Sequence, residues 1–557
     1  MRSPPSAIAT AIDPEPGRAP PRVSGEVATS EAAGVREADG EDDESREIAR
    51  RDAVIALRSA LSLGASLLCT WSLALLVRVI LPRWLGPETF GAFTFADGFT
   101  ATFFIVLGLG VETYIQKEIP VRPAHASDFF GGVIVLRVVM AVLLLGCMML
   151  ALTAMHRSAL VHGLVLVFGA GQFLLAINTS LGSLLQASRA VGGLALVNVF
   201  AKVIWGAGVL LALFLGLGLA ALAGAFVLGE LLRLVVLLPL AKKHVGLKLR
   251  VDLGAVRRLV VASLPYYLTL IACTVYARVD VTMLSLLSTD CEIGWYGAAS
   301  NFAALALLAS PLVGWVLMPM MARAAARSPE DLYRLLRRAI EAALLIALPL
   351  SLLTGLGADV WVRVVFGKAY GPAVLTLHVL APVFLFTYVA MLAATSLVLL
   401  GQAWRVATLS MLGLVINPAL DLLLVRWSSR AFGPGGAGAG AAVALFATEA
   451  FVATAMVATV GRSAFDRRST RAIGVAVAAA FAVVALDRLL APLGAARLLV
   501  DLCAWFALAV AFGAIRPSSL PTILRAFRSI RSERALPAPR SSRPSREEEP
   551  AGPSVAS

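Results

Sequence analysis

The sequence is poor in charge for its length. Charged residues make up 15% of the 557 residues and hydrophobic residues 59%, whereas a soluble domain averages about 25% charged and 45–50% apolar residues. A soluble fold of this size has too few charges to keep so many apolar side chains in solution. The mean hydropathy of +0.83 therefore predicts an all-α, polytopic membrane protein whose solvent is lipid.

Reactive and metal-binding residues are also scarce. The five cysteines form no CxxC pair, and the five histidines are scattered. No Walker A, HExxH or GxSxG motif occurs. We therefore expect no enzyme, no metal centre and no disulfide framework. Without an ATPase motif, energy must come from an ion gradient, the membrane potential or consumption of the product, so Na⁺ or H⁺ is the expected coupling ion and no other cofactor is expected.

Apolar runs are frequent and are separated by short charged or Gly/Pro breaks. They predict about fourteen transmembrane helices. We place these spans at 55–82, 90–112, 128–154, 159–186, 190–214, 219–241, 258–288, 293–322, 334–356, 371–401, 405–426, 437–460, 472–488 and 497–515.

The net charge of +13 follows the predicted topology. With a cytoplasmic N-terminus, about nineteen Lys and Arg fall in inner loops and about seven in outer loops, as the positive-inside rule requires. An even number of spans places the C-terminus in the cytoplasm too. Since no basic stripe stands clear of the apolar runs, we expect no nucleic-acid partner.

Two pairs of segments repeat along the chain. Residues 85–92 and 292–298 each join a short outer loop to an aromatic-Gly-Ala entry into the next span, and residues 224–230 and 442–449 each place a glutamate deep in a small-residue helix. The similar separation of the two pairs predicts two parallel six-helix lobes. The expected organisation is a disordered cytoplasmic extension (1–51), an N-lobe (52–242), a C-lobe (243–461), a C-terminal helix pair (462–515) and a basic cytoplasmic tail (516–557).

The chain resembles the polysaccharide flippases of the multidrug/oligosaccharidyl-lipid/polysaccharide exporter (MOP) superfamily over about residues 52–515. The order and spacing of several short motifs carry the resemblance: 85–91, Val279-Asp280, 292–299, 366–370, Gly401-Gln402, Asn417-Pro418 and 440–442 with Glu449. The acidic N-terminal extension departs from the usual compact start of such proteins.

This resemblance implies a transporter of undecaprenyl-diphosphate-linked oligosaccharide that works by alternating access in the bacterial cytoplasmic (inner) membrane. The product would feed assembly of O-antigen, capsule or exopolysaccharide. The implied partners are the lipid-linked oligosaccharide, membrane lipids, and the polymerase and glycosyltransferases of the same pathway.

Cations inside the spans are the first candidates for binding an anionic head group, because a cationic, water-filled cavity lowers the cost of moving a diphosphate through the membrane. The candidates are Arg78, Arg137, Lys202 and Arg278. Arg78 and Arg278 lie in the first helix of each lobe, which lines the cavity in the resembling family. For Arg137 and Lys202 a structural role is the favoured alternative.

Carboxylates inside the spans are candidates for coupling or gating, because a buried carboxylate binds a proton or Na⁺. The notable carboxylates inside the spans are Asp97, Glu230, Glu341, Asp421 and Glu449. The candidates for coupling or gating are Asp97, Asp280, Glu230 and Glu449, and Glu230 has the alternative of pairing with Arg233. The candidate sugar contacts are Asn178, Asn198, Asn301 and Asn417, each of which serves equally well as a bond between helices.

Three other functions remain open at this stage. A lipid II flippase or a cation-coupled drug antiporter would come from the same superfamily. A membrane glycosyltransferase or ligase would need large outer loops, and the predicted outer loops are short.

Overall fold

The computed structural model describes residues 72–74, 76–118, 126–188, 191–246, 250–309, 317–461 and 466–514. The predicted extension 1–51, most of the first span and the tail 516–557 lie outside these residues. The described residues contain helices and no strand. The predicted all-α class is therefore confirmed. All of the described residues belong to one compact unit, Ala65–Ser557.

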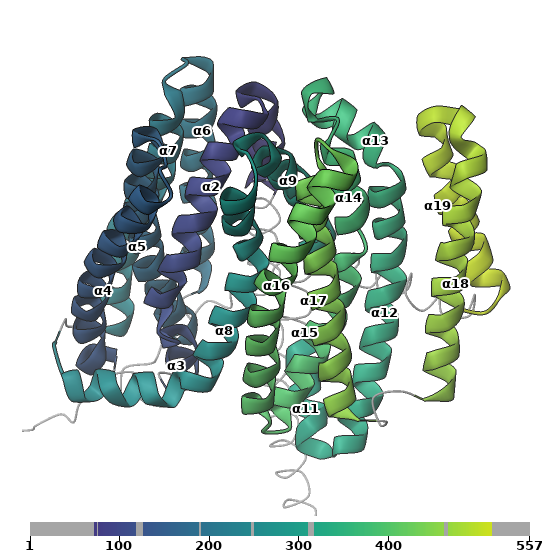
Figure 1. The fold of residues 1–557 in the computed structure, drawn as a ribbon. Helices are drawn as coiled ribbons and strands as arrows, with labels where there is room; N and C mark the ends of the chain where they lie inside the picture. Colours follow the sequence, from purple (N-terminus) through teal and green to yellow (C-terminus); the bar gives the residue numbers. More distant parts are fainter. Residues whose placement is uncertain are drawn as a thin grey trace, which may run out of the picture. The chain divides into compact units, whose positions relative to one another are not determined.

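Residues 76–85 are helical and precede the first labelled helices (Figure 1). The N-terminal helices are α2 (Pro87–Phe104), α3 (Val111–Glu118), α4 (Ala126–Ala154), α5 (Ala159–Ala187), α6 (Val191–Phe214) and α7 (Gly218–Val245). The later helices are α8 (Leu253–Leu287), α9 (Asp290–Ala303), α11 (Met318–Arg327), α12 (Pro329–Leu356), α13 (Ala358–Trp361), α14 (Ala373–Leu380), α15 (Val383–Leu399), α16 (Ala403–Phe432), α17 (Gly436–Val460), α18 (Arg467–Leu490) and α19 (Arg497–Ala511).

Ten helical segments of the described part are long and apolar enough to cross a membrane. They do not include α8, which carries Arg278 and Asp280, and the tenth segment, Arg467–Ala511, contains both α18 and α19. These two helices are separated at Gly494, whose φ of 57° and ψ of −133° are not helical. The chain is thus a multi-pass membrane protein, and the number of fourteen spans stays a prediction.

Several predicted spans differ in detail from the structure. The spans expected to begin at 90 and 293 begin earlier, at Pro87 and Asp290. A proline favours the first turn of a helix, and the Thr289 hydroxyl accepts a hydrogen bond from the Glu292 N–H at the start of α9. The segment predicted as one span over 293–322 is not continuous, since α9 is followed by a 3₁₀ turn (Ala304–Ala309) and a separate α11.

Helix α18 begins at a polar cap outside the apolar segments. The carboxylate of Asp466 accepts a hydrogen bond of 2.7 Å from the Ser469 N–H. This bond favours the charged form and lowers the pKa of Asp466. The cap sets where the C-terminal helix pair starts, and α18 and α19 then pack on each other and on α12 (Figure 1).

The helices that open the two predicted repeats cross each other at glycines. A Cβ atom at Gly91 of α2 would lie 1.8 Å from the carbonyl oxygen of Asp290, and one at Gly294 of α9 would lie 2.0 Å from that of Pro87. Only a residue without a side chain permits this approach. The crossing therefore joins the N-terminal helices to the C-terminal ones at the ends where α2 and α9 begin.

We predict that Gly91→Ala destabilises the protein by about 1–3 kcal/mol, because its methyl group overpacks the crossing. Thermal unfolding of the purified protein in detergent measures the effect. Gly224→Ala in α7 is the matched control, since no atom lies within 4 Å of its added Cβ. Equal melting temperatures for the two variants would contradict the prediction.

Candidate functional site

A cavity of about 440 Å³ lies among helices from both ends of the chain. Its wall includes residues of α2, α5, α6, α7, α8 and α9 and of the helix that precedes α2. We call it the central cavity. It contains five of the residues predicted from the sequence: Arg78, Asp97, Lys202, Arg278 and Asn301.

The charge of the central cavity is positive. Among the described residues that line it, three cations, Arg78, Lys202 and Arg278, face one carboxylate, Asp97. The Arg78 side chain is exposed, and those of Lys202 and Arg278 are half-buried. The ammonium group of Lys202 lies 4.8 Å from the ring centre of Trp205, one turn along α6, a cation–π contact that orients it. The cavity thus suits an anionic ligand.

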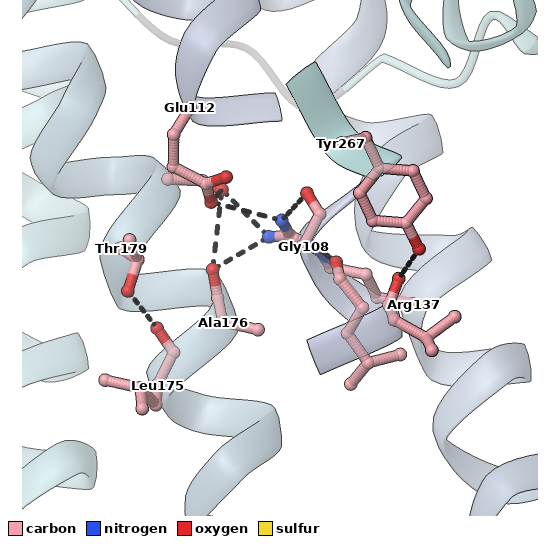
Figure 2. Close-up of polar contacts among 10 residues, drawn as sticks. Gly108, Glu112, Arg137, Leu175, Ala176, Thr179 and Tyr267 are labelled. Atoms are coloured by element: carbon pink, nitrogen blue, oxygen red, sulfur yellow. Dashed lines mark hydrogen bonds and ion pairs between the residues drawn. The ribbon is translucent and has the colours of Figure 1, made fainter. Parts of the chain in front are cut away.

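Arg137, the fourth predicted cation, does not line the central cavity. It is fully buried, and Figure 2 shows its guanidinium inside a network between α4, α5 and the end of α2. It donates to the carbonyl oxygens of Leu107 (2.6 Å), Ala176 (2.8 Å) and Gly108 (3.2 Å) and to the Ser180 hydroxyl (2.9 Å).

Glu112 of α3 completes this network. One of its carboxylate oxygens lies 3.5 Å from the Arg137 guanidinium and accepts a hydrogen bond of 3.1 Å from Ser180. The Tyr267 hydroxyl of α8 donates to the Val106 carbonyl oxygen nearby, at 2.6 Å. Since each bond of the Arg137 guanidinium joins it to another helix, Arg137 holds helices together. This is the structural role that the sequence favours as the alternative for Arg137.

Glu230 and Asn178 occupy a second buried network, between α5 and α7. The amide nitrogen of Asn178 donates to both the carbonyl oxygen (2.8 Å) and a carboxylate oxygen (2.9 Å) of Glu230. Arg233 lies 3.4 Å from the same carboxylate. This is the pairing given above as the alternative to a coupling role for Glu230, and Asn178 acts as a bond between helices.

A third polar cluster lies between α8, α9, α16 and α17. Asp280 is fully buried, and its carboxylate accepts hydrogen bonds from the Tyr296 hydroxyl and the Asn417 amide. The Thr448 hydroxyl donates to the amide oxygen of Asn417 at 3.1 Å. Asp421, one turn after Asn417, is also fully buried and interacts with Asp280. The structure thus brings two fully buried carboxylates together.

Asp280 and Arg278 lie on different faces of α8, as their spacing predicts: Arg278 lines the central cavity and Asp280 does not. Asn198 lines a separate cavity, and Glu449 is buried in α17 outside the central cavity. Tyr296 and Thr448 are not among the predicted site residues, and Asp421 is predicted only as one of the carboxylates inside the spans. Its four-residue spacing from Asn417 places both side chains on one helical face.

Ion pairs and hydrogen bonds also join the helix ends near the α2–α9 crossing. Arg157, between α4 and α5, lies 2.7 Å from the Asp290 carboxylate and stacks 4.5 Å from the ring centre of Phe95. The Tyr370 hydroxyl donates to the Pro82 carbonyl oxygen at 2.7 Å. The 366–370 motif thus contacts the end of the first helix.

The fold is that of the MOP superfamily transporters. The structure matches the lipid II flippase MurJ in its inward closed conformation, with a TM-score of 0.63, 13% identity, and coverage of 84% of this chain and 99% of that one. It also matches an inward-facing multidrug resistance MATE transporter of the MOP superfamily (TM-score 0.58, 16% identity, 74% and 98% coverage). A third match is the Vibrio cholerae MATE transporter VcmN in its bent form (TM-score 0.50, 17% identity, 74% and 97% coverage).

Residues 56–325, just under half of the chain, match the family described as "Polysaccharide biosynthesis protein". The resemblance drawn from the sequence motifs is therefore confirmed. No curated protein sequence matches the chain. The structural neighbours are a flippase and transporters, so the chain has a fold that transporters share.

We predict that Arg137→Met destabilises the protein by about 3–5 kcal/mol, because Glu112 and two helix-end carbonyl groups lose their buried partner. Unfolding in detergent measures the loss. Arg78→Met is the matched control, since its side chain faces the cavity, and we expect it to melt close to the unmodified protein. If both variants lost stability equally, the division of the four cations into cavity and structural groups would be wrong.

Proposed function

We propose that this protein flips undecaprenyl-diphosphate-linked oligosaccharide across the bacterial cytoplasmic membrane by alternating access, for surface polysaccharide assembly. The observation that carries the proposal is the cationic central cavity. Arg78, Lys202 and Arg278 come from both predicted lobes and converge on one volume of about 440 Å³. A diphosphate that enters it exchanges water for charge-assisted hydrogen bonds, which offset the cost of leaving water.

An apolar groove supports a cargo with a lipid tail. It has a volume of about 650 Å³ and runs between α12, α15, α17 and α18, with side chains such as Leu348, Leu385 and Phe481 along its wall. A polyprenyl chain would lie in this groove with little loss of hydrophobic contact relative to the bilayer. A drug antiporter has no need of a groove for a long lipid tail.

The orientation follows the positive-inside rule. With both termini in the cytoplasm, the α2–α9 crossing and the Arg157–Asp290 pair close the outer end of the central cavity. Flipping then requires this crossing to open while the inner end closes. The Arg157–Asp290 pair is only partly exposed, with accessible fractions of 14% and 30% for the two side chains, so it has to break when the crossing opens.

The pair Asp280 and Asp421 supplies a candidate site for the coupling ion. Two adjacent buried carboxylates cannot both stay charged without compensation, and neither oxygen of Asp421 has a hydrogen-bond donor among the described residues. A proton shared by the pair, or a Na⁺ held by the carboxylate, amide and hydroxyl oxygens, would satisfy them. Since α8 carries both Asp280 and Arg278, occupancy of this site would act on the cavity through one helix.

A lipid II flippase is the second candidate, because the MurJ match extends over 84% of the chain and the MATE matches over 74%. Lipid II also joins sugars to a polyprenyl diphosphate, so the central cavity suits it equally.

Deletion of the gene separates the two functions. Loss of surface polysaccharide supports our proposal, whereas accumulation of lipid II with arrest of peptidoglycan synthesis supports the alternative. Normal surface polysaccharide with altered drug resistance would indicate an antiporter.

We predict that Arg278→Ala lowers the surface polysaccharide made by the cell while the amount of protein in the membrane is unchanged. A hydrogen bond to a charged group contributes about 1.5–3 kcal/mol, so cargo binding should weaken about ten- to a hundredfold. Arg405→Ala is the control, because Arg405 is exposed and outside the cavity. Unchanged polymer from the Arg278 variant would contradict the cavity assignment.

We also predict that Asp421→Asn removes the response to an ion gradient. Asparagine keeps the shape but leaves one carboxylate, which Tyr296 and Asn417 already satisfy. In proteoliposomes the variant should flip cargo at the same rate with and without a Na⁺ or H⁺ gradient, while the unmodified protein is accelerated by one of them. Gradient-dependent flipping by the variant would count against this site.

A further inference from the structure

A second polar cavity lies among α3, α5, α6 and α7, with a volume of about 300 Å³. We call it the polar pocket. Hydroxyl and amide groups dominate its wall, together with one acid and one guanidinium: Thr179, Ser183, Gln186, Asn198, Glu112 and Arg233. The function proposed above makes no use of it.

The polar pocket continues the central cavity along one face of α5. Gln172 and Leu175 line the central cavity, and Thr179, Ser183 and Gln186 line the polar pocket. Successive steps of three or four residues keep all five side chains on the same face of the helix. A ligand that follows this face passes from one cavity toward the other.

Helix α6 repeats the pattern. Lys202 and Trp205 line the central cavity, while Asn198 and Leu194 line the polar pocket. Asn198 and Lys202 are four residues apart, which separates them by about 6 Å along the helix axis. The polar pocket therefore begins one helical turn beyond a cation of the central cavity.

The two cavities differ in charge. Each charged group at the wall of the polar pocket has a partner of opposite sign: Glu112 lies 3.5 Å from Arg137, and Arg233 lies 3.4 Å from Glu230. Two buried atoms at this wall, Oδ1 of Asn198 and Nε of Arg233, have no hydrogen-bond partner among the described residues. The pocket thus offers donors and acceptors without net charge, which suits an uncharged ligand rich in hydroxyl groups.

We propose that the polar pocket binds sugar residues of the cargo while the central cavity binds its diphosphate. The inference rests on the proposed function and names the part of the cargo that this site recognises. The sugars nearest the diphosphate reach the pocket along the shared face of α5 and α6. Their hydroxyl groups bond to the side chains of Ser183, Gln186 and Asn198, which then contribute to the choice of oligosaccharide.

Gly182 allows the pocket to be filled without disturbing the fold. It borders the pocket, and a Cβ atom there would meet only Cδ1 of Leu194, at an ordinary contact distance of 3.6 Å. Gly182→Leu therefore places its side chain in the pocket. Gly163→Leu is the matched control on the same helix, because Gly163 is exposed and has no atom within 4 Å of an added Cβ.

The test measures binding of two lipids to the full chain in nanodiscs: undecaprenyl diphosphate, and the same lipid bearing the oligosaccharide repeat purified from the native cells. We expect the unmodified protein and Gly163→Leu to bind the glycosylated lipid more tightly than the bare one. Gly182→Leu should lose this preference and keep its affinity for the bare lipid. Asn198→Ala should weaken binding of the glycosylated lipid alone, about three- to tenfold, as expected for one hydrogen bond.

The pocket assignment is overturned if Gly182→Leu binds both lipids as tightly as the control, or loses both equally while melting at the control's temperature. A pocket that holds only water gives the first of these results. Arg278→Ala, which should weaken binding of both lipids equally, reports on the proposed function separately. If the unmodified protein binds neither lipid, the proposed function fails, and the pocket assignment fails with it.

Discussion

The free-energy cost of placing a charge in a low-dielectric interior determines how the charged residues of this protein are arranged. Most buried charges are compensated by the chain itself: Arg137 by Glu112 and carbonyl oxygens, and Glu230 by Arg233 and Asn178. The central cavity is different, since its cations outnumber its carboxylate. That imbalance is tolerable only in contact with water or an anion, and it marks the place where a ligand contributes the missing charge.

The second constraint is the crossing of α2 and α9, where Gly91 and Gly294 bring backbones into contact. Helices in lipid gain little free energy from burying apolar surface against each other, so their association depends on close van der Waals packing at small residues. The crossing lies at one end of a cavity whose walls come from both predicted lobes. The proposed function requires this crossing to open. The polar networks of α5–α7 and of α8–α17 would stay intact, because each lies within one predicted lobe.

Much of this arrangement could be predicted from the sequence. Arg78 and Arg278 are predicted to face a cavity because the first helix of each lobe lines the cavity in the resembling family. The structure brings both into the same cavity together with Asp97 and Asn301. The alternatives stated for Arg137 and Glu230 were also informative, because an ion in a span without a ligand needs a nearby partner. Asp421 could be recognised as a carboxylate inside a span, but its pairing with Asp280 could not be predicted. The two residues are more than a hundred positions apart in the chain, and no local pattern links them.

The sequence by itself determined the solvent, the helical class and the positions of the charged residues along each apolar run. Hydropathy and charge alternation are local properties of the sequence. In a bilayer every backbone N–H and C=O group must be hydrogen-bonded within the protein, so the chain forms helices or closed barrels. Only the tertiary structure decided which charges neutralise each other and which face a cavity. That outcome depends on the rotation and crossing of helices that are distant in the chain. The residues that set it, above all the glycines of α2 and α9, make contacts that no periodicity along one helix reveals.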